Sequence, residues 1–328
     1  MRRREALIGL AALGVLAPGA QAQGDRLRRI GLLMAGLPAS DAGGQMEAAS
    51  FKTGLKDLGW LAPRNLDLVE RWPGADAALI QAAAKDLVSL PADVIVVRST
   101  PGVAAVLKET RSIPTIFVVV VDPVGSGFVG SLTRPAGNVT GFQNYEFSMV
   151  GKWLQLLKEV APGVQRVTCL YNPATVPPGF VISLKALIAS QVPLQPVATP
   201  VRDSVEINAA VSAFTRKPGG GLMTLPDIFL LANRAQIIDL AAKHALPAIY
   251  TSQLWTAAGG LIAYGPDTPD LFRRASAYVD RILKGEKPGE LPVQMANKYT
   301  LAVNLKTARA LGLKVAPTLL ARADEVIQ

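Results

Sequence analysis

The sequence predicts an α/β protein in which two lobes each contain a doubly wound parallel sheet. The chain has 328 residues, which is enough for two domains of ordinary size. Short runs rich in Val, Ile and Leu alternate with stretches of helical periodicity, and each half of the chain repeats this alternation. Because these runs lack alternating polar residues, they are typical of parallel strands buried on both faces.

In the first half, four apolar runs predict strands at residues 30–34, 66–69, 94–97 and 115–121. After the first strand, Ala48, Phe51 and Leu55 recur at helical spacing, and Gly59 is expected to end this helix. A second helix is predicted at residues 79–87. The first half therefore reads as successive βα units.

The second half predicts four more strands, at residues 167–171, 221–224, 247–250 and 261–264. Helices are predicted between and after them, at residues 181–190, 205–214, 231–244 and 272–282. Eight strands would also suit a single β/α barrel. The connection at residues 122–149 is long and loop-rich, whereas barrel connections are short, so the two-lobed fold is favoured.

The N-terminus predicts a signal peptide, residues 1–22. Arginines at positions 2–4 precede a short apolar run, residues 7–17, and the small residues Ala20 and Ala22 then provide a cleavage site before Gln23. The arginine pair also permits twin-arginine export, so both Sec and Tat remain open. Cleavage removes three arginines and one glutamate and lowers the net charge from +9 to +7.

The mature chain is expected to be exported and soluble. No cysteine lies near the cleavage site to carry a lipid anchor, and no stretch reaches the eighteen consecutive apolar residues of a transmembrane helix. The basic residues are interleaved with acidic ones, without the basic and aromatic clusters of a nucleic-acid surface. No nucleic-acid partner is therefore expected.

The sequence contains a single histidine, His244, and a single cysteine, Cys169. This excludes an intrachain disulfide, a four-cysteine zinc site and a histidine-rich metal site. His244 falls in the last turn of a predicted helix, where it would interact with the helix dipole, and Cys169 falls in a buried strand. We therefore predict no catalytic residues, no metal and no cofactor.

One motif has the letters of a dinucleotide-binding loop, with Gly125, Gly127 and Gly130 in the pattern G-x-G-x-x-G. However, it follows the fourth strand rather than the first, and Asp122 would place a carboxylate where phosphates bind. An exported nucleotide-dependent enzyme that uses this loop remains an alternative hypothesis.

Distinctive sequence strings occur over nearly the whole mature chain, at residues 51–60, 64–65, 70–72, 122–129, 131–142, 171–173, 226–227, 246–250, 258–261, 264–267 and 303–308. In content and in order, these strings resemble one family of ABC transporter substrate-binding proteins, the tryptophan/tyrosine type. The resemblance assigns the glycine motif to a segment that does not bind a dinucleotide.

The resemblance implies a type I periplasmic-binding-protein fold, in which a three-crossing hinge joins two lobes that close on a small ligand. The expected N-terminal lobe is residues 23–143 with 266–293, and the C-terminal lobe is residues 144–265 with 294–328. The resemblance further implies a periplasmic, monomeric protein that delivers an amino acid or related small acid to an ABC permease at the inner membrane. A protein that presents its ligand to a sensor is an alternative.

Ligands of open α/β sheets lie beyond the carboxyl ends of the strands. Ten residues near those ends are the predicted ligand-binding residues: Ala35, Ser99, Thr100, Asp122, Pro123, Asn172, Asp227, Tyr250, Ser252 and Tyr264. Ser99 and Thr100 precede a helix and suit an anionic group, whereas Asp122 and Asp227 suit an ammonium group. The two tyrosines suit an apolar or aromatic side chain.

Overall fold

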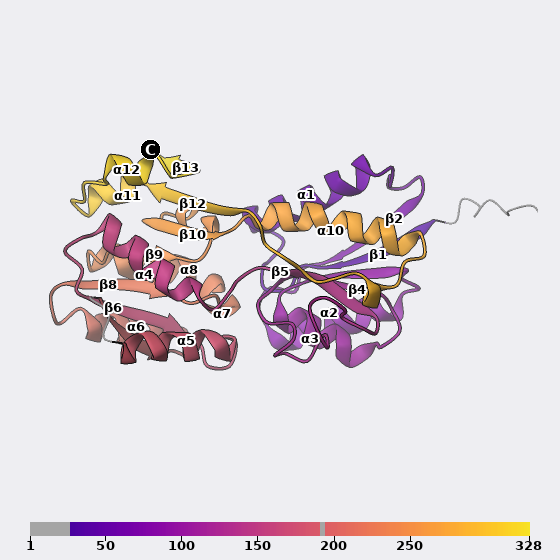
Figure 1. The fold of residues 1–328 in the computed structure, drawn as a ribbon, viewed down its shortest axis with the longest axis horizontal. Helices are drawn as coiled ribbons and strands as arrows, with labels where there is room; N and C mark the ends of the chain where they lie inside the picture. Colours follow the sequence, from indigo (N-terminus) through magenta and orange to yellow (C-terminus); the bar gives the residue numbers. More distant parts are fainter. Residues whose placement is uncertain (1–26, 191–193) are drawn as a thin grey trace, which may run out of the picture.

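The computed structural model describes residues 27–190 and 194–328, so the predicted signal peptide lies outside the described residues. Two lobes lie side by side along the long axis of the molecule, and each has a central sheet with helices on its faces (Figure 1). The predicted fold class is confirmed, and the barrel alternative is wrong because the strands form two separate sheets.

The sheet of the first lobe is parallel throughout. Its strands lie in the order β11 (Gln294–Met295), β5 (Val139–Gln143), β4 (Thr115–Val120), β3 (Val94–Arg98), β1 (Arg28–Leu33) and β2 (Leu66–Arg71). One face is covered by α1 (Ala42–Asp57) and α10 (Thr268–Leu283), and the other by α2 (Ala77–Ser89) and α3 (Thr100–Glu109). A short 3-10 helix, η1 (Pro288–Glu290), leads into β11.

The apolar strand β3 shows why this sheet is buried on both faces. Val94 and Val96 contact the side covered by α1 and α10, whereas Ile95 and Val97 contact the side covered by α2 and α3. Successive side chains of a strand point to opposite faces, so an unbroken apolar run serves two cores at once.

The sheet of the second lobe has the strand order β13 (Glu325–Ile327), β12 (Tyr299–Asn304), β10 (Ile262–Pro266), β9 (Ala248–Tyr250), β8 (Gly220–Thr224), β6 (Arg166–Tyr171) and β7 (Gln195–Pro200). Among these pairs, β10 with β12 is antiparallel and the others are parallel. One face is covered by α4 (Met149–Val160), α5 (Pro178–Ala189), α11 (Leu305–Ala310) and α12 (Pro317–Leu320). The other packs on α6 (Ser204–Phe214), α7 (Ile228–Ala232), α8 (Arg234–Lys243) and α9 (Gln253–Ala257).

Within the described residues, the chain passes between the lobes three times. The passages lie between β5 and α4, between β10 and α10, and between β11 and β12. Figure 1 shows these segments running through the junction of the lobes.

One local expectation was wrong. The predicted helix at residues 231–244 is divided into α7 and α8, because Asn233 leaves helical geometry and donates a side-chain hydrogen bond to the Phe229 carbonyl at 2.8 Å. The connection at residues 122–149 is loop-rich as predicted, and it also contains β5 and the first residue of α4.

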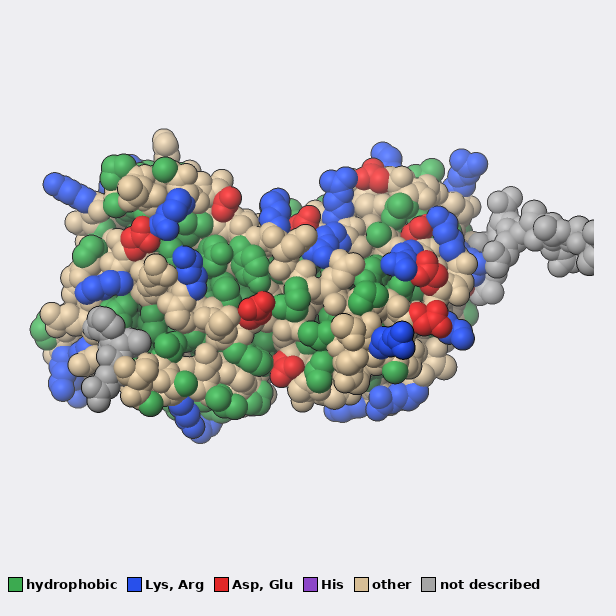
Figure 2. Space-filling view, in the orientation of Figure 1, with side chains coloured by type: hydrophobic (Ala, Val, Ile, Leu, Met, Phe, Trp, Pro, Cys, Tyr) green, Lys and Arg blue, Asp and Glu red, His purple; other side chains and the backbone are tan. Residues whose placement is uncertain are grey.

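The described ranges 27–190 and 194–328 contain no helix that combines the length and apolar character needed to cross a membrane. In the same residues, no group of three His, Cys, Asp or Glu side chains is arranged to hold a metal ion. On the face shown in Figure 2, Lys and Arg side chains are spread over both lobes rather than gathered in one patch.

Candidate functional site

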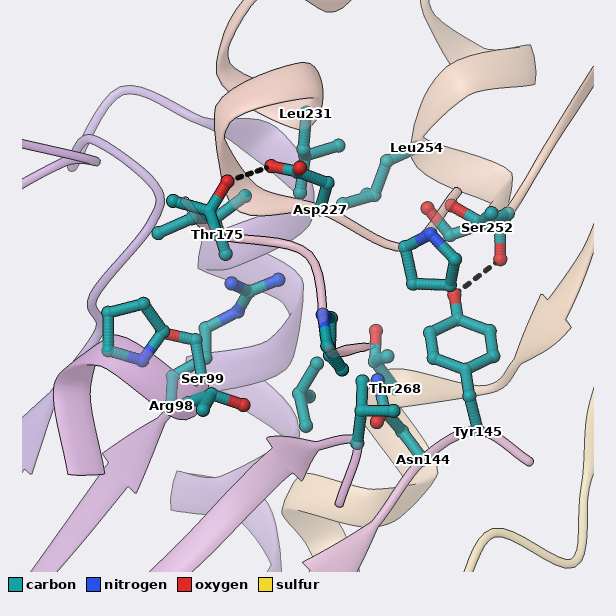
Figure 3. Close-up of a pocket in the computed structure, with 18 of the residues that line it drawn as sticks. Arg98, Ser99, Asn144, Tyr145, Thr175, Asp227, Leu231, Ser252, Leu254 and Thr268 are labelled. Atoms are coloured by element: carbon teal, nitrogen blue, oxygen red, sulfur yellow. Dashed lines mark hydrogen bonds between the residues drawn. The ribbon is translucent and has the colours of Figure 1, made fainter. Parts of the chain in front are cut away.

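A cavity of about 670 Å³, its open mouth included, lies between the two lobes (Figure 3). The first lobe contributes residues of α1, the carboxyl ends of β3 and β4, and the start of α3. The second lobe contributes residues that follow β6, β8 and β9, and the first two crossings contribute Asn144, Tyr145 and Thr268. The cavity therefore occupies the strand-end position where open α/β sheets bind ligands.

A buried ion pair forms part of the lining on the first lobe. Arg98 ends β3, and its Nε donates to Glu47 Oε2 of α1 at 2.7 Å, with side-chain exposures of 3% and 1%. Arg98 Nη1 also donates to the Ala35 carbonyl oxygen at 3.3 Å. Figure 3 shows the guanidinium group of Arg98 directed into the cavity. Its remaining N–H groups can donate to a carboxylate of a ligand.

Backbone strain lies next to this pair. Ser99 has φ 70° and Val119 has φ 61°, at the ends of the adjacent strands β3 and β4. Both residues line the cavity. Left-handed backbone at residues other than glycine is costly and gathers at functional sites. Here it turns the chain so that Ser99 and Thr100 face the cavity at the start of α3.

Asp227 joins the loop after β6 to the start of α7 through hydrogen bonds within the second lobe. Its Oδ1 accepts hydrogen bonds from Thr175 Oγ1 at 2.7 Å and from the Phe229 amide at 2.7 Å, and its Oδ2 accepts one from the Asn172 amide at 2.8 Å. The Leu230 amide contributes a longer bond of 3.4 Å to Oδ1. Because a carboxylate offers about four acceptor positions, these donors leave little capacity for a ligand ammonium. Asp227 instead holds Thr175 at the cavity wall.

The titration of Asp227 gives a test of this role. Burial raises the pKa of this carboxyl group above its ordinary value, although the hydrogen bonds from Thr175 and the three amides oppose the shift. The folded protein then binds this proton more tightly than the unfolded chain. The stability from this group is complete below about pH 4 and is lost as the pH rises through the folded-state pKa.

We therefore expect the wild-type protein to lose stability relative to an Asp227→Asn variant as the pH rises above about 4. Urea unfolding of both proteins across this range measures the difference. A difference that instead grows in favour of the wild type with rising pH would mean that the carboxylate is stabilised as an anion.

Three contacts lie around the cavity, and the last two of them join the lobes. The Tyr145 hydroxyl donates to the Thr251 carbonyl at 2.5 Å, as drawn in Figure 3, and burial raises the pKa of this phenol, so it remains a donor. Asp41, which caps α1, pairs with Arg234 of α8. Gly43 packs against Leu254, which fills the space that a side chain would need. The lobes are thus apposed around a shared cavity.

Of the ten predicted residues, the structure brings four to this cavity: Ser99, Thr100, Asp227 and Ser252. Ala35 lies buried behind Arg98 and supplies the carbonyl described above. Asp122 accepts a hydrogen bond from the Gly125 amide at 2.8 Å and braces its turn, and the Pro123 carbonyl accepts one from the Phe128 amide at 2.9 Å.

The other three predicted residues serve the second lobe. The Asn172 side chain accepts from the Ala174 amide at 2.9 Å and shapes the loop after β6. Tyr250 stacks on Trp255 with ring centroids 4.7 Å apart, and Tyr264 stacks on Tyr299 at 5.7 Å. These aromatic rings pack inside the protein rather than along the interlobe cavity.

The sequence interpretation missed Glu47, Arg98, Asn144, Tyr145 and Thr175, which line the cavity. Two of them carried a signal. Arg98 is a charge at the end of an apolar strand, and Glu47 lies one helical turn before Phe51 on the buried face of α1. A charge on a buried face needs a partner, and here each is the partner of the other.

The sequence profile of a family described as ABC transporter substrate binding protein matches residues 40–327. The chain belongs to this family. Members of the family bind substrates and are not enzymes, which removes the dinucleotide-dependent enzyme as an alternative. The loop at Gly125–Gly130 agrees with this, because no helix begins within residues 127–138, all of them described, to receive a pyrophosphate.

This substrate-binding protein is similar to a tyrosine-binding protein of Clostridioides difficile strain R20291, with 27% identity over 265 residues, which cover 80% of this chain and 76% of that protein. Among solved structures, it resembles a conserved domain protein of Vibrio cholerae, with a TM-score of 0.81, 25% identity, and coverage of 92% and 100%. A Streptococcus pneumonia ABC domain in complex with L-Trp matches with a TM-score of 0.81, 22% identity, and coverage of 92% and 99%. The last of these comparisons concerns the fold alone.

Proposed function

We propose that this protein is the exported solute-binding component of an ABC importer, and that it captures an amino acid or a related small acid between its lobes. The observation that carries the proposal is the interlobe cavity, which both lobes line and which contains the buried Arg98–Glu47 pair. A similar chain is a tyrosine-binding protein, and a protein of the same fold is a complex with L-Trp.

The cavity lining suits a ligand with a polar end and an apolar end. Arg98, Glu47 and Ser99 give the first lobe a charged and polar wall. The second lobe contributes the apolar side chains of Ile228 and Leu231 beside the polar Thr175 and Ser252. A ligand that touches both walls stabilises the closed arrangement, because only that arrangement provides both sets of contacts. Hinge closure is therefore part of the proposal.

The closed complex would then dock on a permease at the inner membrane. In this proposal the protein acts as a periplasmic monomer without a lipid anchor, after removal of residues 1–22. A micromolar dissociation constant would correspond to about −8 kcal/mol of binding free energy.

A ligand panel tests this function. The mature chain is mixed with the common L-amino acids, small carboxylic acids, sugars and NAD(P), and thermal unfolding is followed. A ligand present at a hundred times its dissociation constant stabilises the folded state by about 2.7 kcal/mol, so a true ligand raises Tm. We expect an amino acid or small acid to do so, with small-angle scattering showing a more compact protein than the ligand-free one. A panel without any ligand would overturn the proposal.

A further inference from the structure

Unpartnered polar atoms gather at the interlobe cavity. In the described residues, five buried side-chain atoms have no hydrogen-bond partner within the protein: Glu47 Oε1, Ser99 Oγ, Asn144 Oδ1, Thr224 Oγ1 and His244 Nε2. The first three belong to residues that line the cavity. Buried polar groups are nearly always hydrogen-bonded, so three such atoms around one cavity point to a shared missing partner.

The chemistry of these atoms restricts that partner. Glu47 Oε1 is a carboxylate oxygen and accepts hydrogen bonds, as does the amide oxygen of Asn144, while the Ser99 hydroxyl can donate or accept. Glu47 is 0% exposed, and Asn144 and Ser99 are each 2% exposed. The missing partner must therefore bring donors into a site with little access to water.

Arg98 positions the carboxylate of Glu47. Its Nε holds Oε2, and the Ala35 carbonyl holds Nη1, so the two bonds fix the side chain between β3 and α1. Oε1 of Glu47 is then free to accept a hydrogen bond from a ligand. A donor that carries positive charge forms the stronger hydrogen bond with a carboxylate in such surroundings.

We propose that Glu47 and Asn144 determine the specificity of this cavity by accepting hydrogen bonds from a positively charged N–H group of the ligand. This inference rests on the proposed solute-binding function and narrows it. The ligand carries an ammonium group, and an acid of the same shape without the nitrogen is rejected. The carboxylate of the same ligand is assigned to the free N–H groups of Arg98 and to Ser99, at the start of α3.

The test compares ligands that differ only in the amino group. The probes are L-tryptophan with indole-3-propionate, L-tyrosine with 3-(4-hydroxyphenyl)propionate, and L-leucine with 4-methylpentanoate, titrated into the mature protein by calorimetry. For the pair that binds, we expect the amino acid to bind about 100-fold more tightly or better, because the acid leaves Glu47 and Asn144 unpartnered.

Two variants assign this discrimination to residues. Glu47→Gln is expected to weaken binding of the amino acid about 30-fold or more, because the amide lacks the charge of the carboxylate. The affinity for the matched acid should stay within about threefold of the wild-type value. Asn144→Ala is expected to weaken binding of the amino acid about fivefold and to leave the affinity for the matched acid nearly unchanged. A purely structural role would weaken both ligands of a pair alike, which would overturn the inference.

Thr224→Val is the matched control, because it removes a buried unpartnered hydroxyl group that does not line the cavity. It should keep the wild-type affinities. If the wild-type protein binds amino acid and acid equally, water alone satisfies these atoms and the inference fails, while the solute-binding function stands. If Glu47→Gln does not fold, the inference is still tested by the ratio of the amino-acid and matched-acid affinities in the wild-type protein and in Asn144→Ala. If no solute of the wider panel binds, the proposed function itself fails.

Discussion

Replacing Arg98 by methionine is expected to lower the free energy of unfolding by about 3–5 kcal/mol, because it leaves Glu47 as a buried charge without its partner. The ion pair has side-chain exposures of only 3% and 1%, and Oε1 of Glu47 already lacks a partner in the protein. Urea unfolding measures this loss. The same variant should bind the solute at least about tenfold more weakly, because Arg98 directs its guanidinium group into the cavity.

A double variant separates stability from binding. Removing both charges with Glu47→Leu and Arg98→Met should restore most of the lost stability, since apolar residues often replace a buried ion pair without cost. Binding should not return. A double variant as unstable as Arg98→Met, or one that binds the solute like the wild type, would contradict the role given to the pair.

The exposed pair of Arg71 with Asp86 is a control for the loss of any ion pair. Its Nε–Oδ2 distance is 2.6 Å, close to that of the buried pair, but its side chains are 39% and 49% exposed. Arg71→Met should change stability by less than about 1 kcal/mol, because solvent screens exposed pairs. The contrast isolates burial as the cause of the larger effect.

The strands that position the site could be predicted because their sequences leave few alternatives. The run at residues 94–97 is apolar throughout and forms β3, whose two faces meet two different cores. Once the strand ends are known, the general position of ligands in open α/β sheets follows. This reasoning found Ser99, Thr100, Asp227 and Ser252.

The same reasoning could not tell which strand-end side chains face the cavity. Tyr250 ends β9 as expected, whereas Tyr264 lies in the middle of β10, which continues to Pro266. Each ring stacks on a neighbouring ring, Tyr250 on Trp255 and Tyr264 on Tyr299. Such pairings join residues whose proximity depends on the packing of whole elements. Asp122 and Asn172 are similarly used by their own turns, a role that short polar side chains favour.

The residues that were missed come from elements whose approach depends on how the two lobes pack together. Glu47 reaches the cavity from α1, and Asn144 and Tyr145 reach it from the first crossing. Their place is set by the contact between the lobes and not by local periodicity. The C-terminal strands show the same limit, since β12 pairs with β10 and β13 pairs with β12 only after intervening helices.

Replacing Gly265 by alanine is expected to lower the free energy of unfolding by about 3 kcal/mol and to weaken solute binding about tenfold or more. A Cβ atom at this position would lie 1.8 Å from the Thr251 carbonyl oxygen and 3.2 Å from the Tyr145 hydroxyl. The Thr251 carbonyl belongs to the backbone and cannot rotate away from the added Cβ atom as a flexible side chain could. Either β10 or the backbone at Thr251 must therefore shift. Either movement disturbs the hydrogen bond from Tyr145 to Thr251 and displaces Ser252 in the cavity wall.

Gly151→Ala is the matched control for this prediction. Gly151 lies in α4, and no described atom outside its own helix backbone and chain neighbours comes within 4 Å of the added Cβ, so the change should stabilise the protein by up to about 1 kcal/mol through helix propensity. Urea unfolding and calorimetric titration of both variants provide the comparison. If Gly265→Ala unfolds and binds like the wild type, the close approach of β10 to Thr251 does not hold the cavity wall in place. If it loses binding while stability is unchanged, the glycine acts on the apposition of the lobes rather than on the packing of the second lobe.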